Sequence, residues 1–244
     1  MNRFHASGFH FLTSLSIGLL LLGLFWFVWY PAPMLMAIGG HEIFLLVIGI
    51  DIVLGPLLTL IVFKAGKKGM KFDLMVIAVL QIGAMAYGVS TLLEGRPAYV
   101  AALGERFQVV QASELTDANL AKAKTVLPWW GPQWVGTTMP TNKHDISILS
   151  AMSAVGGGAG HLPYLHVPYD TMKATILEHA QDISIIEKNN PAQLHDIQMW
   201  LQDHHVTEDL VKFQPIKIRA SVFPVILDAK SAKVIGIMPF ILKM

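Results

Sequence analysis

An acidic side chain lies in the middle of an apolar stretch that is long enough to cross a membrane. The stretch covers residues 43–63, and its one charged residue is Asp51, followed by the helix-breaking pair Gly55 and Pro56. A carboxylate near the centre of a bilayer costs about 2.5–3.5 kcal/mol to insert, so such a residue indicates a function. Asp51, Gly55 and Thr59 are spaced by four residues and therefore share one face of a helix.

This face has the chemistry of a helix-docking surface. Small residues let two membrane helices approach closely, and a polar side chain can hydrogen-bond across the contact. Proline leaves one helical carbonyl without its donor and favours a kink. The predicted docking residues are Asp51, Gly55, Pro56, Thr59 and, in the third apolar stretch, Gln81.

Two other roles for Asp51 have to be weighed. The carboxyl group could instead hydrogen-bond inside the protein, with Gln81 as its partner, because membrane acids usually face the interior of a helix bundle. A proton or ion pathway is disfavoured, since pumps contain relays of ionisable groups and the apolar stretches hold only Asp51 near mid-depth.

The composition excludes several classes of protein. Of the 244 residues, 53% are hydrophobic and only 14% are charged, whereas about a quarter of a soluble domain is charged. There is no cysteine, which excludes disulfides, thiolate metal sites and cysteine nucleophiles. The net charge of +1 is evenly spread and gives no basic face for nucleic acid.

Three apolar runs divide the first part of the chain into membrane spans at residues 11–30, 43–63 and 74–93. Each is long enough to cross a hydrocarbon core of about 30 Å. Lysines crowd residues 64–71, whereas residues 31–42 contain no lysine or arginine. By the positive-inside rule the N-terminus is cytoplasmic and everything after the third span lies outside, in the periplasm of a bacterium.

The sequence therefore predicts a membrane protein with a three-helix transmembrane region at 1–94 and a periplasmic α+β domain at 95–244. Residues 96–103 and 106–112 read as a hairpin around Gly104 and Glu105. Helices are expected at 116–125, with Thr116 as N-cap, and at 145–152, 170–180 and 189–202. In the last of these, Asn190 is the expected cap, and Leu194, Ile197 and Leu201 share a face. Residues 216–240 are expected to form a single hairpin that turns at 228–232.

Other motifs in the domain have simpler explanations than catalysis. The glycine cluster "SAVGGGAGH" at 153–161 lacks phosphate-loop and dinucleotide spacing and is predicted to be a flexible loop. The histidines follow no zinc-binding pattern and are expected on the surface. We therefore predict no catalytic residue, no metal site and no cofactor.

Tryptophans cluster in "LPWWGPQW" at 127–134. Trp129, Trp130 and Trp134 form a candidate surface for a partner or for the bilayer, because tryptophan combines a large apolar ring with a polar N–H. The competing interpretation, which the usual burial of tryptophan favours, is a corner of the domain core.

Several of these segments together resemble the TfpX/TfpZ family of type IV pilin accessory proteins. They are "FVWYPAP", "GIDIVLGPLLTLIVFK" and "GKKGMKFDLMVIAVLQ", followed by "RPAYV", "RFQVV" and the looser match "VILDAKSAKVIGIM" near the end. The resemblance implies a multi-pass protein of the bacterial inner membrane with a periplasmic domain. It also implies a role in type IV pilus assembly or dynamics, with a cognate pilin as partner.

The expected function is thus that of a non-enzymatic accessory factor in the inner membrane. Its expected partners are the cognate pilin, the lipid bilayer and further pilus assembly components, with no nucleic acid. Two alternatives stay open: a membrane-anchored periplasmic sensor or ligand-binding module, and a membrane enzyme that processes pilin. A deep polar pocket would favour the first, and a convergent cluster of catalytic side chains the second.

Overall fold

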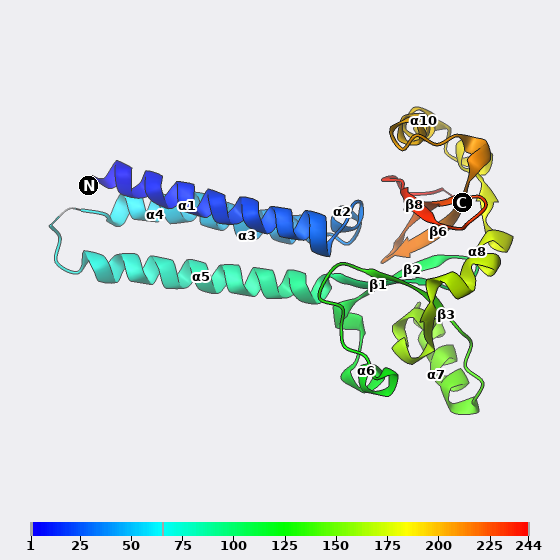
Figure 1. Ribbon diagram of the computed structural model, residues 1–244. Coiled ribbons are helices and arrows are strands. Elements are labelled where there is room, and N and C mark those ends of the chain that lie inside the picture. The colour runs from blue at the N-terminus through cyan, green and yellow to red at the C-terminus, as the bar shows by residue number, and fades with distance from the viewer. Residues whose placement is uncertain (1, 65, 244) are drawn as a thin grey trace. The chain divides into compact units, whose positions relative to one another are not determined.

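The computed structural model describes residues 2–64 and 66–243, which divide into two compact units (Figure 1). Unit 1 comprises Met1–Pro31 and Gly39–Arg96, and unit 2 comprises Ala32–Ile38 and Pro97–Met244. The boundary lies close to the one expected at residue 94, with one difference. The short segment 32–38, which separates the first two spans in the sequence, belongs to unit 2.

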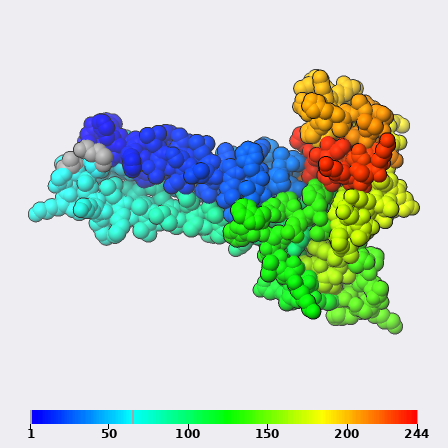
Figure 2. All heavy atoms as spheres, in the orientation of Figure 1, coloured from blue at the N-terminus to red at the C-terminus, as the bar shows by residue number. Residues whose placement is uncertain are grey.

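Unit 1 contains the helices that can cross a membrane. Among the described residues, three helical stretches have the required length and hydropathy, Arg3–Trp29, Gly40–Val62 and Met70–Gly95. Each helix begins before the apolar run expected from the sequence, because polar residues such as His41 and Lys71 also adopt the helical conformation. The component helices are α1 (Arg3–Leu24), η1 (Phe25–Trp29), α3 (Gly40–Gly49), η2 (Ile50–Leu54), α4 (Gly55–Val62) and α5 (Met70–Gly95). In Figure 2 the blue atoms of α1 lie directly against the cyan atoms of the later spans.

Unit 2 is built on one mixed sheet. In the described residues the strand order is β4-β3-β1-β2-β6-β7-β8, and β5 pairs separately with β6. The β1–β3 and β2–β6 pairs are parallel, whereas the other pairs are antiparallel. The strands are β1 (Pro97–Ala102), β2 (Phe107–Gln111), β3 (Gln133–Thr137), β4 (His166–Pro168), β5 (Gln181–Asp182), β6 (Val211–Ile218), β7 (Ser221–Asp228) and β8 (Val234–Ile237).

Helices cover the sheet at its two ends. The α-helices are α2 (Met34–Ala37), α6 (Asp117–Ala123), α7 (Lys143–Ala154), α8 (Lys173–His179), α9 (Ile183–Asn189) and α10 (Leu194–Asp203). Figure 1 shows α6 and α7 near β3, and α10 near β8. Short 3₁₀ turns connect them: η3 (Ala112–Glu114), η4 (Ala159–His161), η5 (Pro163–Leu165), η6 (Tyr169–Met172), η7 (Pro191–Gln193) and η8 (Glu208–Leu210). One core cluster joins α9 and α10 to β6 and β7 through Ile186, Ile197, Phe213 and Ile226. The membrane helices and the mixed domain confirm the predicted fold class.

The β1–β2 hairpin and the predicted helices are present, and Thr116 caps α6 as expected. The helix expected at 170–180 begins as a 3₁₀ turn and becomes α8 only at Lys173. Asn190 occupies the expected N-cap position, with Pro191 first in the following turn, but its side chain makes no capping hydrogen bond there. Instead, its Nδ2 donates to the Ile186 carbonyl of α9, and its Oδ1 accepts from the Lys243 backbone N–H, which holds the C-terminal segment in place. Leu194 is exposed, while Ile197 and Leu201 are buried.

The hairpin expected at 216–240 is present as β7 and β8, but its first arm is shorter than expected. The chain turns at Arg219, which has a positive φ of 54°, so Ile218 ends β6 and Ser221 begins β7. The alternation of apolar and polar residues continues through this turn, which is why the pattern read as one strand. The turn expected at 228–232 does occur, between β7 and β8.

The second part of the glycine cluster, residues 158–161, is buried, whereas Val155 and Gly156 are exposed. A side chain at Gly160 would lie 2.8 Å from the Ala101 Cβ of β1, and one at Gly158 would lie 2.9 Å from the Gln108 side chain of β2. Glycine is therefore required for the close approach of this loop to the sheet. His161 at the end of the loop is buried, which corrects the expectation that the histidines lie on the surface.

We predict that residues 97–244 fold as a soluble domain, and that adding residues 32–38 through a flexible linker stabilises it. Arg219 donates a hydrogen bond to the Ile38 carbonyl at 2.7 Å, and Met34 and Leu35 are buried. Thermal melts followed by far-UV circular dichroism should show a cooperative transition at a higher Tm with the segment. One kcal/mol corresponds to about 2–4 °C for a domain of this size.

The matched control for this measurement carries the same linker and segment with Arg219→Ala. The gain in Tm should then shrink. A fragment without any cooperative melt would contradict independent folding of unit 2.

Candidate functional site

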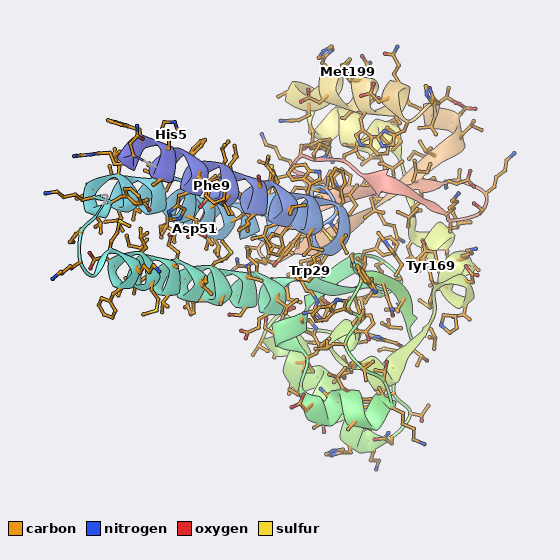
Figure 3. The ribbon with its side chains drawn as sticks, turned by 60° about the vertical axis from the view of Figure 1, so that its left-hand side comes forward. His5, Phe9, Trp29, Asp51, Tyr169 and Met199 are labelled. Carbon is orange, nitrogen blue, oxygen red and sulfur yellow. The ribbon has the colours of Figure 1, made fainter. Side chains whose placement is uncertain are left out.

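The membrane helices enclose a buried polar cluster around Asp51. Its side chain is only 1% exposed, and Figure 3 shows it between α1 and α5. Gln81 of α5 donates from Nε2 to the backbone carbonyl and to Oδ1 of Asp51, both at 3.3 Å. The partner expected from the sequence is therefore the one found in the structure.

Gly55 makes this hydrogen bond possible. A Cβ added at Gly55 would lie 2.1 Å from Gln81 Nε2, so any larger residue would displace the amide group. Gly88, farther along α5, plays the same part against Val47 of α3, where an added Cβ would lie 2.1 Å from a Val47 methyl group. Both close contacts follow the general use of small residues at membrane-helix interfaces.

Pro56 changes the helix geometry at Asp51. The turn Ile50–Leu54 that precedes Gly55 and Pro56 is a wide π-helical turn. Proline has no N–H to complete the regular hydrogen-bond pattern, and such a turn accommodates the gap. The Pro56 carbonyl accepts a hydrogen bond from the Ser7 hydroxyl of α1 at 2.8 Å. The kink region is thus held by the first helix.

The first span supplies polar and small residues that the sequence analysis missed. His10 Nδ1 lies 2.7 Å from the Thr59 hydroxyl, and Ser14 is buried in the same interface. A Cβ at Gly18 would approach the Ile48 side chain at 3.2 Å. Ser7, Ser14 and Gly18 recur with helical spacing, and this pattern is a sequence signal that could have identified the face.

The predicted docking face is thus turned toward other helices of the same chain. Asp51, Gly55, Pro56 and Thr59 are all buried in unit 1. Asp51 Oδ2 and Gln81 Oε1 are buried as well, with no hydrogen-bond partner in the described part of the chain. This arrangement favours the internal role of Asp51. Docking of a partner helix at the same face stays a prediction.

The tryptophan cluster separates into two parts. Trp129 and Trp130 are exposed, whereas Trp134 on β3 packs edge-on against Phe107, with ring centres 5.4 Å apart, and against Tyr169 (labelled in Figure 3). The core-corner interpretation therefore applies to Trp134 and is wrong for Trp129 and Trp130. The role of these tryptophans as a partner surface stays a prediction.

Unit 2 also contains a polar cavity of about 360 Å³ beside the glycine loop. Lys217 donates to the Gly156 carbonyl at 3.0 Å. Glu114 accepts a hydrogen bond from the Gln111 backbone N–H, and its carboxylate lies 3.6 Å from His161. Burial acts to raise the pKa of Glu114, but the hydrogen bonds from His161 and Gln111 outweigh it and hold the pKa below its usual range. The charged groups of the cavity are thus engaged with the protein itself.

We predict that Gly55→Ala destabilises unit 1, because the new methyl group forces Gln81 away from Asp51. A hydrogen bond between membrane helices contributes about 0.6 kcal/mol on average and up to about 1.7, and the expected loss lies in that range. Thermal unfolding of the purified protein in detergent measures it.

Gly49→Ala in α3 is the matched control, because an added Cβ there meets no atom within 4 Å. Gln81→Ala should remove the clash, so adding Gly55→Ala to it should cost little more. Equal behaviour of the Gly55 and Gly49 variants would contradict the assigned contact.

Comparison with known proteins gives matches over nearly the whole chain. The fimbrial assembly protein of serogroup I from Dichelobacter nodosus is 30% identical over 229 residues, which cover 91% of this chain and 89% of that protein. The serogroup E1 protein of the same organism is 28% identical over 229 residues, which again cover 91% of this chain and 89% of that protein. The protein of serogroups C1 and C2 is 42% identical over 96 residues, or 38% of this chain and 73% of that protein.

No protein-family model and no solved structure matches the chain. The first of these alignments is long enough to include both the membrane helices and most of the mixed α+β domain. On this similarity, the chain belongs to the family of fimbrial assembly proteins.

Proposed function

We propose that this protein is a non-enzymatic accessory factor of the bacterial inner membrane that acts on a cognate type IV pilin during pilus assembly or pilus dynamics. The observation that carries the proposal is the alignment with a fimbrial assembly protein over about nine-tenths of both chains. Within that family, the segments described above favour the TfpX/TfpZ type.

The membrane unit supports an action on pilin before or after it enters the fibre. The large side chains that the central parts of α1, α3 and α5 turn outward are mostly apolar, among them Leu20, Leu45 and Leu80. Such a surface suits contact with an apolar helix that is itself embedded in the bilayer. The second unit would then contact the pilin head or further assembly components.

The proposed orientation places the N-terminus in the cytoplasm and unit 2 in the periplasm. The lysines of residues 64–71 carry this assignment through the positive-inside rule. One of them, Lys67, pairs with Asp73 at the start of α5 at 2.6 Å. Because Asp73 is in the first turn of that helix, its charge also favours the helix dipole.

A ligand-binding module is the second candidate, and the polar cavity is the observation that favours it. Its cations and its acid already bind groups of the protein: Lys217 binds Gly156, Arg219 binds Ile38, and Glu114 binds Gln111. A ligand would have to compete with these contacts. We therefore prefer the accessory role.

The proposed orientation predicts the activity of reporter fusions. A periplasm-active reporter fused after Met244 should be active, and one fused within residues 64–71 should be silent. Met244 and Ala65 themselves lie outside the described residues. A cytoplasm-active reporter at the same positions is the control and should give the opposite result. Reversed activities would overturn the orientation.

The proposed function predicts that pilin co-purifies with this protein from solubilised inner membranes. Protein level, bound pilin and surface piliation should be measured together for the wild type, for Asp51→Ala and for Val53→Ala. Val53 is on the same helix but exposed, and its replacement should change nothing.

The outcome for Asp51→Ala separates the two roles of this residue. A normal protein level with lost pilin binding would support docking at this face, whereas a reduced protein level would support the internal role. Wild-type protein that binds no pilin, together with unchanged piliation after deletion of the gene, would contradict the proposed function.

A further inference from the structure

An exposed apolar loop connects α6 to β3. Val126 is 82% exposed, Trp130 is 70% exposed, and Trp129 between them is 55% exposed. Lys124, at the start of the loop, is exposed as well. Large apolar side chains that gather on a surface usually mark a binding site for a protein or a membrane.

The strand pairing locates this loop at one end of the sheet. Strands β1 and β3 are parallel, and Tyr99 pairs with Gln133, so both strands begin at the same end. The loop immediately precedes Gln133. The Arg219 turn lies at this end too, because β6 runs parallel to β2, and the end of β2 pairs with the start of β1.

The same end of the sheet is where unit 2 connects to the membrane helices. Strand β1 begins at Pro97, two residues after α5 ends at Gly95. Ile38, which Arg219 holds, precedes the second span by two residues. A residue spans at most about 3.6 Å, so these links are shorter than about 10 Å. Both chain connections between the membrane spans and unit 2 are therefore made at this end of the sheet, through short links.

A loop with this composition suits the boundary between lipid and water. Tryptophan is enriched there because its ring is largely apolar while its indole N–H can bind headgroups or water. Lys124 would lie among lipid phosphates, which attract a cation. A protein surface is the competing occupant, but the short links to the spans favour the bilayer.

We propose that residues 124–130 form a membrane-interface anchor, in which Trp129 and Trp130 insert into the headgroup region of the bilayer that the helices cross. The anchor would restrict rotation of unit 2 about its short links. The inference rests on the membrane insertion of the chain and is independent of its action on pilin.

The absence of cysteine from the chain allows a direct measurement of depth. A nitroxide label is attached at Trp130→Cys or at Val126→Cys in the full-length protein, reconstituted without pilin in nanodiscs of phosphatidylethanolamine and phosphatidylglycerol. The Val126 variant keeps both tryptophans and serves if the Trp130 variant fails to fold. Collision rates with oxygen, which enriches in lipid, and with a water-soluble nickel chelate are then compared.

Met139→Cys is the matched control. Met139 is 75% exposed and follows the opposite end of β3, which ends at Thr137. We expect the ratio of oxygen to nickel collisions to be several-fold higher at positions 126 and 130 than at 139. Equal ratios at all of them would overturn the proposal. So would a loop that is open to nickel in nanodiscs and becomes protected only after purified pilin is added, because the occupant would then be a protein.

Discussion

The hydrocarbon core of a bilayer offers no water to a polar group, so backbone groups of a membrane helix have to be satisfied inside the protein, and polar side chains usually face the interior of the helix bundle. This constraint organises unit 1. The Gln81 amide binds Asp51, His10 meets Thr59, and the Ser7 hydroxyl binds the carbonyl of Pro56. These contacts connect the first span and the third span to the second, which carries the acid and the proline. A polar residue that is costly in lipid thereby becomes a source of specific packing.

Small residues allow these contacts to form. Gly55 leaves space for the Gln81 side chain, Gly88 leaves space for Val47, and Gly18 lies against Ile48. Because the largest polar side chains of the spans point inward, the large side chains that remain outward along the spans are mostly apolar, with Thr13, Ser16 and Ser90 as small polar exceptions. A helix that approached unit 1 from the bilayer would therefore contact mainly apolar side chains. It could reach Asp51 or Gln81 only if the helices of unit 1 separated.

Unit 2 is constrained by its short links to the membrane helices. The chain enters unit 2 twice, at residues 32–38 and at the start of β1 (Pro97), and both lie at the same end of the sheet. The charged Arg219 side chain donates a hydrogen bond to the Ile38 carbonyl and so holds the first of these segments there. The glycine loop closes against the neighbouring strands, where Gly160 leaves no room for a side chain. Both chain connections between the two units thus enter unit 2 at one end of its sheet.

The sequence by itself determined the features that depend on local signals. The membrane spans follow from the length of the apolar runs, α6 follows from its Thr116 cap, and the β1–β2 hairpin follows from two apolar strands around Gly104. In each case the signal lies within a few residues of the structure it specifies. The pairing of Gln81 with Asp51 was also accessible, because few polar groups exist at that depth to satisfy an acid.

Only the tertiary structure decided which surfaces face inward. A membrane helix is apolar on all sides, so hydropathy does not distinguish a face that packs from a face that meets lipid, and the inward direction of Asp51 and Thr59 depends on α1 and α5. The half-buried position of Trp134 likewise depends on a residue distant in the sequence, Phe107. The turn at Arg219 preserves the alternating pattern of a strand and is visible only from the pairing of β6 with β7. Local sequence specifies an element; contacts between distant elements determine what that element touches.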